Sequence, residues 1–321
     1  MIKSLNIQNF KSIKHLHMNC KKINVFIGKP NTGKSNILES IGLFSLPYGH
    51  LKDKDFVRFE NMSNMFYDNE VSEMIKIIAD DKRCEVKFQN GMFEVTIVDK
   101  ERKIFYLRAD YKGDELDISK LDELPVKFYR FAVINDFTRM DSVSLSPPKG
   151  ENLLFILQTN KAFKNLVKDI FSEYSLRIGF RPQERKLEAV KQIEDVIISH
   201  PYSLVSDTLQ RVVFHLAAIE TNKDSIIIFE EPEAHSFPYY TKFLAESIAR
   251  DKTNQYFIST HNPYFLLSLI EKSPKDDIGV FITYFEDYQT KVRTLSEEEM
   301  SEVLDLDTDI FFNLDKFVGE E

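Results

Sequence analysis

The sequence has no tryptophan and only two cysteines, Cys20 and Cys84, among its 321 residues. Two cysteines cannot build the disulfide framework that stabilises small secreted domains. Residues 1–14 lack the apolar core of a signal peptide, and no stretch approaches the roughly 18 consecutive apolar residues of a membrane-spanning helix. These absences predict a reduced, cytoplasmic protein that meets a membrane only through a partner.

A net positive charge is also absent. The chain has 42 lysines and arginines against 51 aspartates and glutamates, a formal charge of −9. Residues 286–321 hold twelve acidic and three basic residues, so residues 1–285 are neutral overall. A uniformly basic surface for nucleic acid is therefore excluded, although local patches, and with them DNA binding, stay open. We interpret the acidic tail as a solvated end; closure of a groove to phosphate chains is an alternative.

The first part of the chain alternates between strand and helix patterns. Residues 23–27 form a compact apolar run that ends at Gly28, which predicts a buried strand. Residues 34–46 place their apolar side chains on one helical face. Residues 84–134 alternate in polarity around an Asn90-Gly91 turn and include a later strand-like run over 126–131. That pattern predicts a small antiparallel meander.

The second part of the chain alternates helices with apolar strands. Residues 226–229 and 256–258 read as buried strands, and helical patterns over 209–217 and 240–248 precede them. This alternation predicts a parallel, helix-covered sheet and an α/β fold class. We expect an amino-terminal lobe over residues 1–136, a helical lobe over 137–203 and a carboxyl-terminal lobe over 204–321. A capping box from Ser296 to Glu299 predicts a last helix.

One motif carries specific chemistry. Residues 28–35 fit the phosphate-binding pattern GxxxxGK[ST], and they lie between a predicted strand and a predicted helix, as the mechanism requires. Backbone N–H groups of such a loop cradle the phosphates of a nucleotide. We expect Lys34 to reach the β- and γ-phosphates and Ser35 to bind Mg²⁺. The other predicted nucleotide contacts in and beside this loop are Gly28, Lys29, Pro30, Asn31, Thr32, Gly33 and Asn36.

Two further groups of polar residues follow buried strands. Glu230 and Glu231 end the apolar run 226–229, and His261 follows the strand 256–258. Phosphoryl transfer requires an acid for the metal and a group that positions the attacking water. We assign Glu230 to Mg²⁺, Glu231 to the water and His261 to sensing the γ-phosphate. All three are expected at the sheet edge where such folds bind ligands.

The motifs GKPNTGKS, SIIIFEEPEAHSFP and FISTHNP resemble those of the ATP-binding-cassette (ABC) ATPases of the RecF, SMC and OLD type, found in DNA repair and phage defence. The opening IKSLNIQNFKSIKHL is similar to the first strand and turn of that branch. The resemblance implies a P-loop ATPase head that binds ATP and Mg²⁺ and hydrolyses ATP slowly. It implies Glu231 as the catalytic glutamate, His261 as the switch histidine and Lys11 as a basic residue that contacts nucleotide.

The resemblance also implies a signature helix that contacts ATP held by an opposing subunit. Residues 204–211 occupy the corresponding place but lack the usual glycines. Ser206 or Asp207 can cap a helix that begins near Thr208, and such a helix end favours a γ-phosphate. An ordinary helix cap is the alternative. For the glutamine that links the metal to the helical lobe, Gln89 and Gln158 qualify by residue type only.

Residues 137–201 contain too little heptad pattern for a long coiled-coil arm, and about 50 residues follow the last motif, too few for an appended nuclease domain. The expected protein is therefore an ATPase that dimerises head to tail around ATP and regulates a separate effector, such as a nuclease or toxin. A transporter subunit, a non-hydrolysing scaffold, and a nuclease that uses Asp81, Glu85 and Lys87 are the alternatives.

Overall fold

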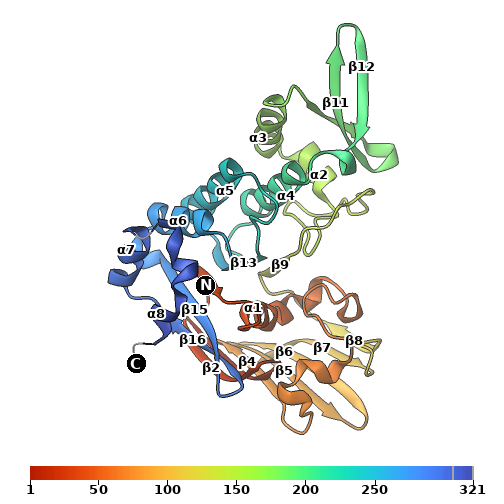
Figure 1. Cartoon of the computed structure of the whole chain (residues 1–321). Helices are drawn as coiled ribbons and strands as arrows, with labels where there is room; N and C mark the ends of the chain where they lie inside the picture. Colours follow the sequence, from red (N-terminus) through yellow and green to blue (C-terminus); the bar gives the residue numbers. More distant parts are fainter. Residues whose placement is uncertain (306, 320–321) are drawn as a thin grey trace.

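The computed structural model describes residues 1–305 and 307–319, and its centre is a six-stranded sheet (Figure 1). The strand order is β16-β15-β3-β14-β13-β9. All neighbours pair in parallel except β15 and β16, which form an antiparallel hairpin. The strands are β3 (Ile23–Gly28), β9 (Val126–Tyr129), β13 (Ile226–Glu230), β14 (Gln255–Ser259), β15 (Ile278–Glu286) and β16 (Gln289–Thr294).

A seven-stranded antiparallel sheet lies on the other side of α1 (Lys34–Gly42), so that this helix is enclosed between two sheets (Figure 1). Its order is β2-β1-β4-β5-β6-β7-β8. The strands are β1 (Ser4–Phe10), β2 (Ile13–Asn19), β4 (Ile75–Ala79), β5 (Lys82–Gln89), β6 (Met92–Asp99), β7 (Arg102–Ala109) and β8 (Glu115–Lys120). Ile37, Leu38 and Ile41 of α1 are buried in one apolar cluster with side chains of both sheets.

Helices cover the opposite face of the central sheet and pack in a second apolar cluster. They are α4 (Asp207–Thr221), α5 (Pro238–Arg250) and α6 (Pro263–Lys272). The chain continues into α7 (Glu297–Asp305) and α8 (Leu314–Val318). Ser296 and Glu299 form the predicted capping box, since the backbone N–H of each donates to the side chain of the other, at 2.8 and 3.2 Å. Short 3-10 helices span Leu43–Tyr48, Leu51–Asp53, Met62–Met65, Tyr67–Asn69, Pro182–Glu184, Tyr202–Leu204, Lys275–Asp277 and Asp307–Phe312.

The segment predicted as helical contains both helices and strands. Its elements are α2 (Leu153–Thr159), α3 (Lys161–Ser172), β10 (Arg177–Arg181), β11 (Lys186–Ile193) and β12 (Val196–Pro201). The strands form a separate antiparallel sheet in the order β10-β11-β12. The β11–β12 hairpin projects away from the rest of the molecule (Figure 1).

Two further sequence expectations need correction. The run 126–131 was expected in the meander, but β9 pairs in parallel with β13 in the central sheet. The reason is burial on both faces, because Phe128 belongs to the apolar cluster around α1 and Tyr129 to the cluster under α4. The helix predicted over 34–46 is α-helical only to Gly42 and continues as a 3-10 turn.

Candidate nucleotide-binding site

The glycines of the phosphate-binding loop are required by close contact with the β15–β16 hairpin. Gly33 has a φ of 97°, and a Cβ there would lie 2.1 Å from the Thr290 hydroxyl oxygen. A Cβ on Gly28 would lie 2.3 Å from the Thr283 hydroxyl oxygen. Only glycine tolerates both the left-handed backbone and these contacts. The loop therefore enters α1 with its backbone in a defined curl.

Lys34 is a buried cation at the start of α1. Its Nζ donates to the carbonyl oxygens of Gly28 and Lys29, at 2.9 and 2.8 Å. Burial lowers the pKa of Lys34 to about 8, and the nearby charge of Glu231 opposes that shift. A largely desolvated ammonium beside a helix N-terminus favours a phosphate group. The geometry fits the role predicted for Lys34.

Other loop residues contact protein groups. Thr32 Oγ1 donates to Lys29 O at 2.8 Å, and Asn31 has a φ of 63°. Lys29 forms an exposed ion pair with Asp315 of α8, at 2.7 Å. Asn36 Nδ2 donates to Ser12 Oγ at 2.7 Å. Pro30 lies in this loop, where it lines a cavity together with Lys29 and Thr32.

The three predicted motifs meet at one edge of the central sheet. In β3, β14 and β13, which are adjacent and parallel, Phe26 pairs with Ser259 and Ser259 pairs with Glu230. His261 Nε2 lies 3.5 Å from Glu231 Oε1. Burial lowers the pKa of His261, the charge of Lys34 lowers it further, and Glu231 opposes both. Lys34, Glu231 and His261 thus interact electrostatically although their motifs are far apart in the chain.

Glu230 is held by two arginines that the sequence interpretation missed. Arg58 Nη2 lies 3.2 Å from Glu230 Oε1, and Arg130 Nη1 lies 3.2 Å from Glu230 Oε2. Both arginines also contact Oε1 of Glu39, a fully buried residue of α1, at 2.5 and 3.2 Å. The other Glu39 oxygen accepts from Lys11. Each Glu230 oxygen therefore lies beside one guanidinium, and lone pairs of the carboxylate remain for a further ligand.

Lys11 lies in the turn between β1 and β2 with a φ of 51°. Burial lowers its pKa, and the bond to Glu39 opposes that shift. The Lys11 side chain is only 13% exposed, so it is not a solvated surface lysine. Lys11 is instead a largely buried cation packed against α1, the helix that follows the phosphate-binding loop.

Ser206 is the N-cap of α4, which begins at Asp207. The backbone N–H of Leu209 donates to Ser206 Oγ at 3.3 Å. Thr208 Oγ1 donates to His235 O at 2.9 Å, so the helix start is tied to the loop that follows Glu231. This contact places the signature-like segment beside the loop that follows β13 in the same chain.

The strand that pairs with β13 on its outer side ends at Tyr129 and is followed by Arg130. Gln89 ends β5 and pairs with Met92 across a hairpin turn, and Gln158 belongs to α2. A guanidinium, rather than the amide of either glutamine, therefore lies next to Glu230. The sequence analysis did not predict that β9 pairs with β13, and this pairing is what places Arg130 beside Glu230.

The donor set suits Mg²⁺ only together with a nucleotide. Ser35 and Glu230 offer the oxygen ligands that this ion prefers. Ser259 Oγ, buried at the same sheet edge, has no hydrogen-bond partner among residues 1–305 and 307–319. This hydroxyl is therefore free to donate or accept a hydrogen bond with a ligand. Within those residues no group of three or more His, Cys, Asp or Glu side chains could hold a metal ion. The residues fit a Mg²⁺ whose remaining ligands are phosphates and water.

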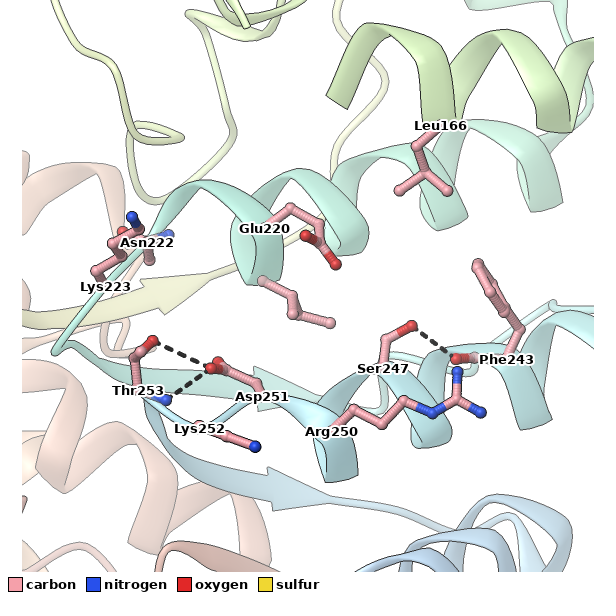
Figure 2. Close-up of a pocket in the computed structure, with 11 residues that line it drawn as sticks. Leu166, Glu220, Asn222, Lys223, Phe243, Ser247, Arg250, Asp251, Lys252 and Thr253 are labelled. Atoms are coloured by element: carbon pink, nitrogen blue, oxygen red, sulfur yellow. Dashed lines mark hydrogen bonds between the residues drawn. The ribbon is translucent and has the colours of Figure 1, made fainter. Parts of the chain in front are cut away.

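A groove of about 450 Å³ lies near the amino-terminal ends of β13 and β14 in the central sheet (Figure 2). Residues of α4, of α5 and of the segment that follows α5 face each other across it, among them Glu220, Phe243 and Asp251. Asn222 and Thr253, which also line it, precede β13 and β14. The groove therefore lies at the amino ends of these strands, away from the phosphate-binding loop.

Residues 1–177 match the family described as AAA ATPase domain, which covers more than half of the chain. The chain belongs to this family. Residues 94–268 also match the family described as AAA domain, putative AbiEii toxin, Type IV TA system. The phosphate-binding loop of this AAA ATPase lies in the first range, and Glu230, Glu231 and His261 lie in the second.

Curated relatives match part of this AAA ATPase. The DNA replication and repair protein RecF of Clostridioides difficile (strain 630) is 37% identical over 91 residues, which are 26% of this chain and 24% of that protein. RecF of Clostridium tetani (strain Massachusetts / E88) is 29% identical over 126 residues, which are 38% of this chain and 29% of that protein. The chain thus spans between 24% and 29% of the length of these relatives.

Two solved structures share the fold over nearly the whole chain. The SmcHead bound to the C-winged helix domain of ScpA has a TM-score of 0.56 and 18% identity, covering 94% of this chain and 99% of that one. The Smc head domain with an extended coiled coil, bound to the C-terminal domain of ScpA derived from Pyrococcus furiosus, has a TM-score of 0.52 and 15% identity, covering 95% and 98%. The predicted RecF- and SMC-like ATPase head fold is confirmed.

One of the alternatives, the nuclease, can be compared with the structure of this AAA ATPase. The charged residues of the nuclease alternative pair with neighbours on their sheet: Asp81 with Lys82 at 2.7 Å, Glu85 with Arg83 at 3.1 Å and Lys87 with Glu94 at 3.2 Å. These side chains form partly exposed ion pairs on the solvent-facing side of the sheet, as the charged residues of a solvated sheet surface do. Across the described part of the chain, no helix combines the length and apolar character needed to span a bilayer.

Proposed function

We propose that this AAA ATPase binds ATP with Mg²⁺, hydrolyses it slowly as a head-to-tail dimer, and regulates a separate effector protein. The observation that carries the proposal is the convergence of Lys34, Glu231 and His261 at one sheet edge. Burial lowers the pKa of both Lys34 and His261, the charge of Lys34 lowers the pKa of His261 further, and the charge of Glu231 raises both pKa values against these shifts. The Glu231 and His261 side chains are 3.5 Å apart. A phosphate loop, a base and a polar sensor are the parts that ATP hydrolysis needs.

Each residue has a stated role in the proposal. The loop from Gly28 to Ser35, with Asn36, holds the phosphates, and Lys34 places its charge on the β- and γ-phosphates. Glu231 accepts the proton of the attacking water, and His261 donates a hydrogen bond toward the γ-phosphate. Mg²⁺, held by Ser35 and Glu230, neutralises phosphate charge when bound. Lys11 contributes a further positive charge beside α1.

Dimerisation accounts for the capped start of α4. The N-terminus of a helix carries partial positive charge and free N–H groups. Ser206 is exposed and lies at this helix end, so it is available to a γ-phosphate held by a second subunit. Thr208 is hydrogen-bonded to His235 in the loop that follows Glu231. Contact of α4 with a nucleotide of the second subunit would therefore affect the position of this loop in the first subunit.

The sharpest test of the proposal uses Glu231→Gln. Removing the base while keeping the side-chain shape is expected to preserve ATP binding, lower hydrolysis by about 100-fold or more, and accumulate an ATP-bound dimer. ATP turnover and gel filtration with ATP and Mg²⁺ measure these effects. Lys34→Ala, which should lose ATP binding, is the matched control. A Glu231→Gln variant that stays monomeric under saturating ATP would refute the sandwich mechanism.

The proposed effector is a nuclease, a toxin or a DNA-repair protein. Support comes from names alone: one matched family is described as a putative AbiEii toxin, and the relatives are DNA replication and repair proteins. Phage defence and DNA repair both fit an ATPase head that lacks a domain of effector chemistry among its described residues. Affinity capture with Glu231→Gln and ATP, compared with Lys34→Ala, is expected to enrich one effector in the first sample only.

A further inference from the structure

The loop that follows β13 is held in an unusual conformation. Glu231 has a φ of 47° and His235 a φ of 59°. Non-glycine residues persist in this left-handed region only where the surroundings enforce it. The Glu231 N–H donates to Ser259 O at 3.0 Å, and the Ala234 N–H donates to Glu231 O at 3.0 Å. These bonds constrain the backbone at Glu231, and the next constraint comes from the side chain of Glu233.

Glu233 is a buried acid that no predicted role uses. Its side chain is 5% exposed, and Thr260 Oγ1 donates to its Oε1 at 2.5 Å. Its Oε2 has no hydrogen-bond partner within residues 1–305 and 307–319. Burial raises the pKa of Glu233 to about 7, with a smaller contribution from the charge of Glu231, and the bond from Thr260 opposes the shift. The neutral form is therefore well populated near pH 7.

Thr260 connects this acid to the rest of the site. Its backbone N–H donates to Phe26 O of β3, at 3.1 Å, and its hydroxyl accepts from the Asn262 N–H at 3.0 Å. Asn262 in turn caps α6 by accepting from the Phe265 N–H at 3.1 Å. His261 thus lies between two residues whose positions are set by hydrogen bonds. The bond from Thr260 to Glu233 is a buried side-chain link between the His261 segment and the Glu231 loop, in addition to the 3.5 Å contact of His261 with Glu231.

We propose that Glu233 is a positioning residue, which holds the Glu231 carboxylate and the His261 imidazole at their observed separation by accepting the hydrogen bond from Thr260. The inference rests on the proposed ATP hydrolysis for its kinetic consequence. Glu233 touches neither the nucleotide nor the water in this scheme. Its contribution is an acceptor oxygen in a buried position, so glutamine, whose amide oxygen is also an acceptor, should replace it.

Kinetics separate positioning from binding. Glu233→Ala and Thr260→Val are each expected to lower kcat by about 10- to 100-fold, because a displacement of about 1 Å in a reacting group has an effect of this size. KM for ATP should change little, since the phosphate-binding loop is untouched. Glu233→Gln should retain kcat within a factor of about three. The double variant should be no worse than either single one, because both remove the same link.

Thr221→Val is the control for loss of a threonine hydroxyl that both donates and accepts a hydrogen bond. Thr221 Oγ1 donates to Ala217 O at 2.6 Å and accepts from the Leu145 N–H at 2.8 Å. It lies at the end of α4, near the amino edge of β13 and away from the site. This variant should lose thermal stability comparable to that of Thr260→Val but keep the wild-type kcat.

A second readout does not need turnover. The titration midpoint of His261, followed by NMR of isotope-labelled histidine and assigned with His261→Gln, should shift in Glu233→Ala and Thr260→Val but stay unchanged in Glu233→Gln and Thr221→Val. If the wild type binds ATP without hydrolysing it while this shift pattern is observed, the proposed function fails and the positioning role stands. An unchanged kcat and an unchanged His261 midpoint in Glu233→Ala overturn the inference, as does a Gln variant as impaired as the Ala variant.

Discussion

At the scale of single residues, burial determines the chemistry of the site more than charge count does. Glu39 is fully buried and contacts Lys11, Arg58 and Arg130, so three cations are concentrated beside α1 in a chain whose overall charge is negative. The two arginines also bind Glu230. A positive phosphate site can therefore exist without a basic protein surface, because a buried carboxylate holds the cations in place.

The lowered pKa of Lys34 has a measurable consequence for ATP affinity. Above pH 8 the free protein increasingly lacks this charge, whereas bound phosphates favour the ammonium form, so binding takes up a proton. We expect affinity to fall with rising pH above 8, approaching about tenfold per pH unit. Calorimetry at pH 7, 8 and 9 measures this. Lys34→Arg, whose guanidinium stays charged, should bind independently of pH, and a flat wild-type profile would contradict the assignment.

At the scale of elements, the start of α4 combines a structural and a proposed functional role. Ser206→Ala removes the cap and should lower the free energy of unfolding by about 1 kcal/mol. Ser206→Asp keeps a capping oxygen and should keep that stability. Its negative charge would oppose a γ-phosphate from a second subunit, so the ATP-dependent dimer should be lost.

Chemical denaturation measures the stability of both Ser206 variants, and gel filtration in the Glu231→Gln background measures their dimers. A Ser206→Asp variant that dimerises normally would show that Ser206 is only a helix cap. A dimer lost in Ser206→Asp but kept in Ser206→Ala would localise the effect to charge rather than to helix stability.

The tip of the β11–β12 hairpin should be dispensable for folding. Val196 and Ile197 are 60% and 70% exposed, so they contribute little buried apolar area. Val196→Thr combined with Ile197→Lys is expected to leave the melting temperature and ATP binding unchanged and to reduce self-association, since charge protects an edge strand. Differential scanning fluorimetry and light scattering check this. A fall of several degrees would show that the tip is packed.

At the scale of the whole molecule, one buried histidine should make stability depend on acid. His215 packs between Phe214 and Phe229, and its Nδ1 lies 2.8 Å from Arg211 O. Burial lowers its pKa to about 3; the hydrogen bond to the Arg211 backbone opposes this shift, and the Arg211 charge adds a smaller lowering. Below the ordinary pKa of about 6.5 the unfolded chain binds a proton that the folded chain excludes. The free energy of unfolding should therefore fall between pH 6.5 and 3, by up to about 1.4 kcal/mol per pH unit.

Urea denaturation at pH 7, 6 and 5 measures this dependence on His215. His215→Phe, which fills the same aromatic contacts without a titrating group, should show a slope smaller by one proton. Carboxylates contribute equally to both proteins, so the comparison isolates the histidine. Equal slopes in the two proteins would mean that His215 accepts its proton in the folded state.

Local patterns in the chain were sufficient to predict the central motifs of the whole molecule. A glycine loop between an apolar strand and an amphipathic helix, and acids or a histidine directly after apolar strands, are short-range signals. Parallel pairing then places their carboxyl ends at one edge, as Glu230, Ser259 and Phe26 show by their register. The fold class, the phosphate-binding loop and the shared edge therefore followed from sequence alone.

The tertiary structure alone decided which side chains surround Glu230 and Glu231. Arg58 and Arg130 reach Glu230 across 172 and 100 positions of sequence, and Thr260 meets Glu233 across 27. Hydrogen bonds and ion pairs depend on separation in space, and strand order sets that separation without leaving a local pattern. β9 pairs with β13 rather than joining the expected meander, and this pairing places Arg130 beside Glu230. Residue spacing could not have revealed it.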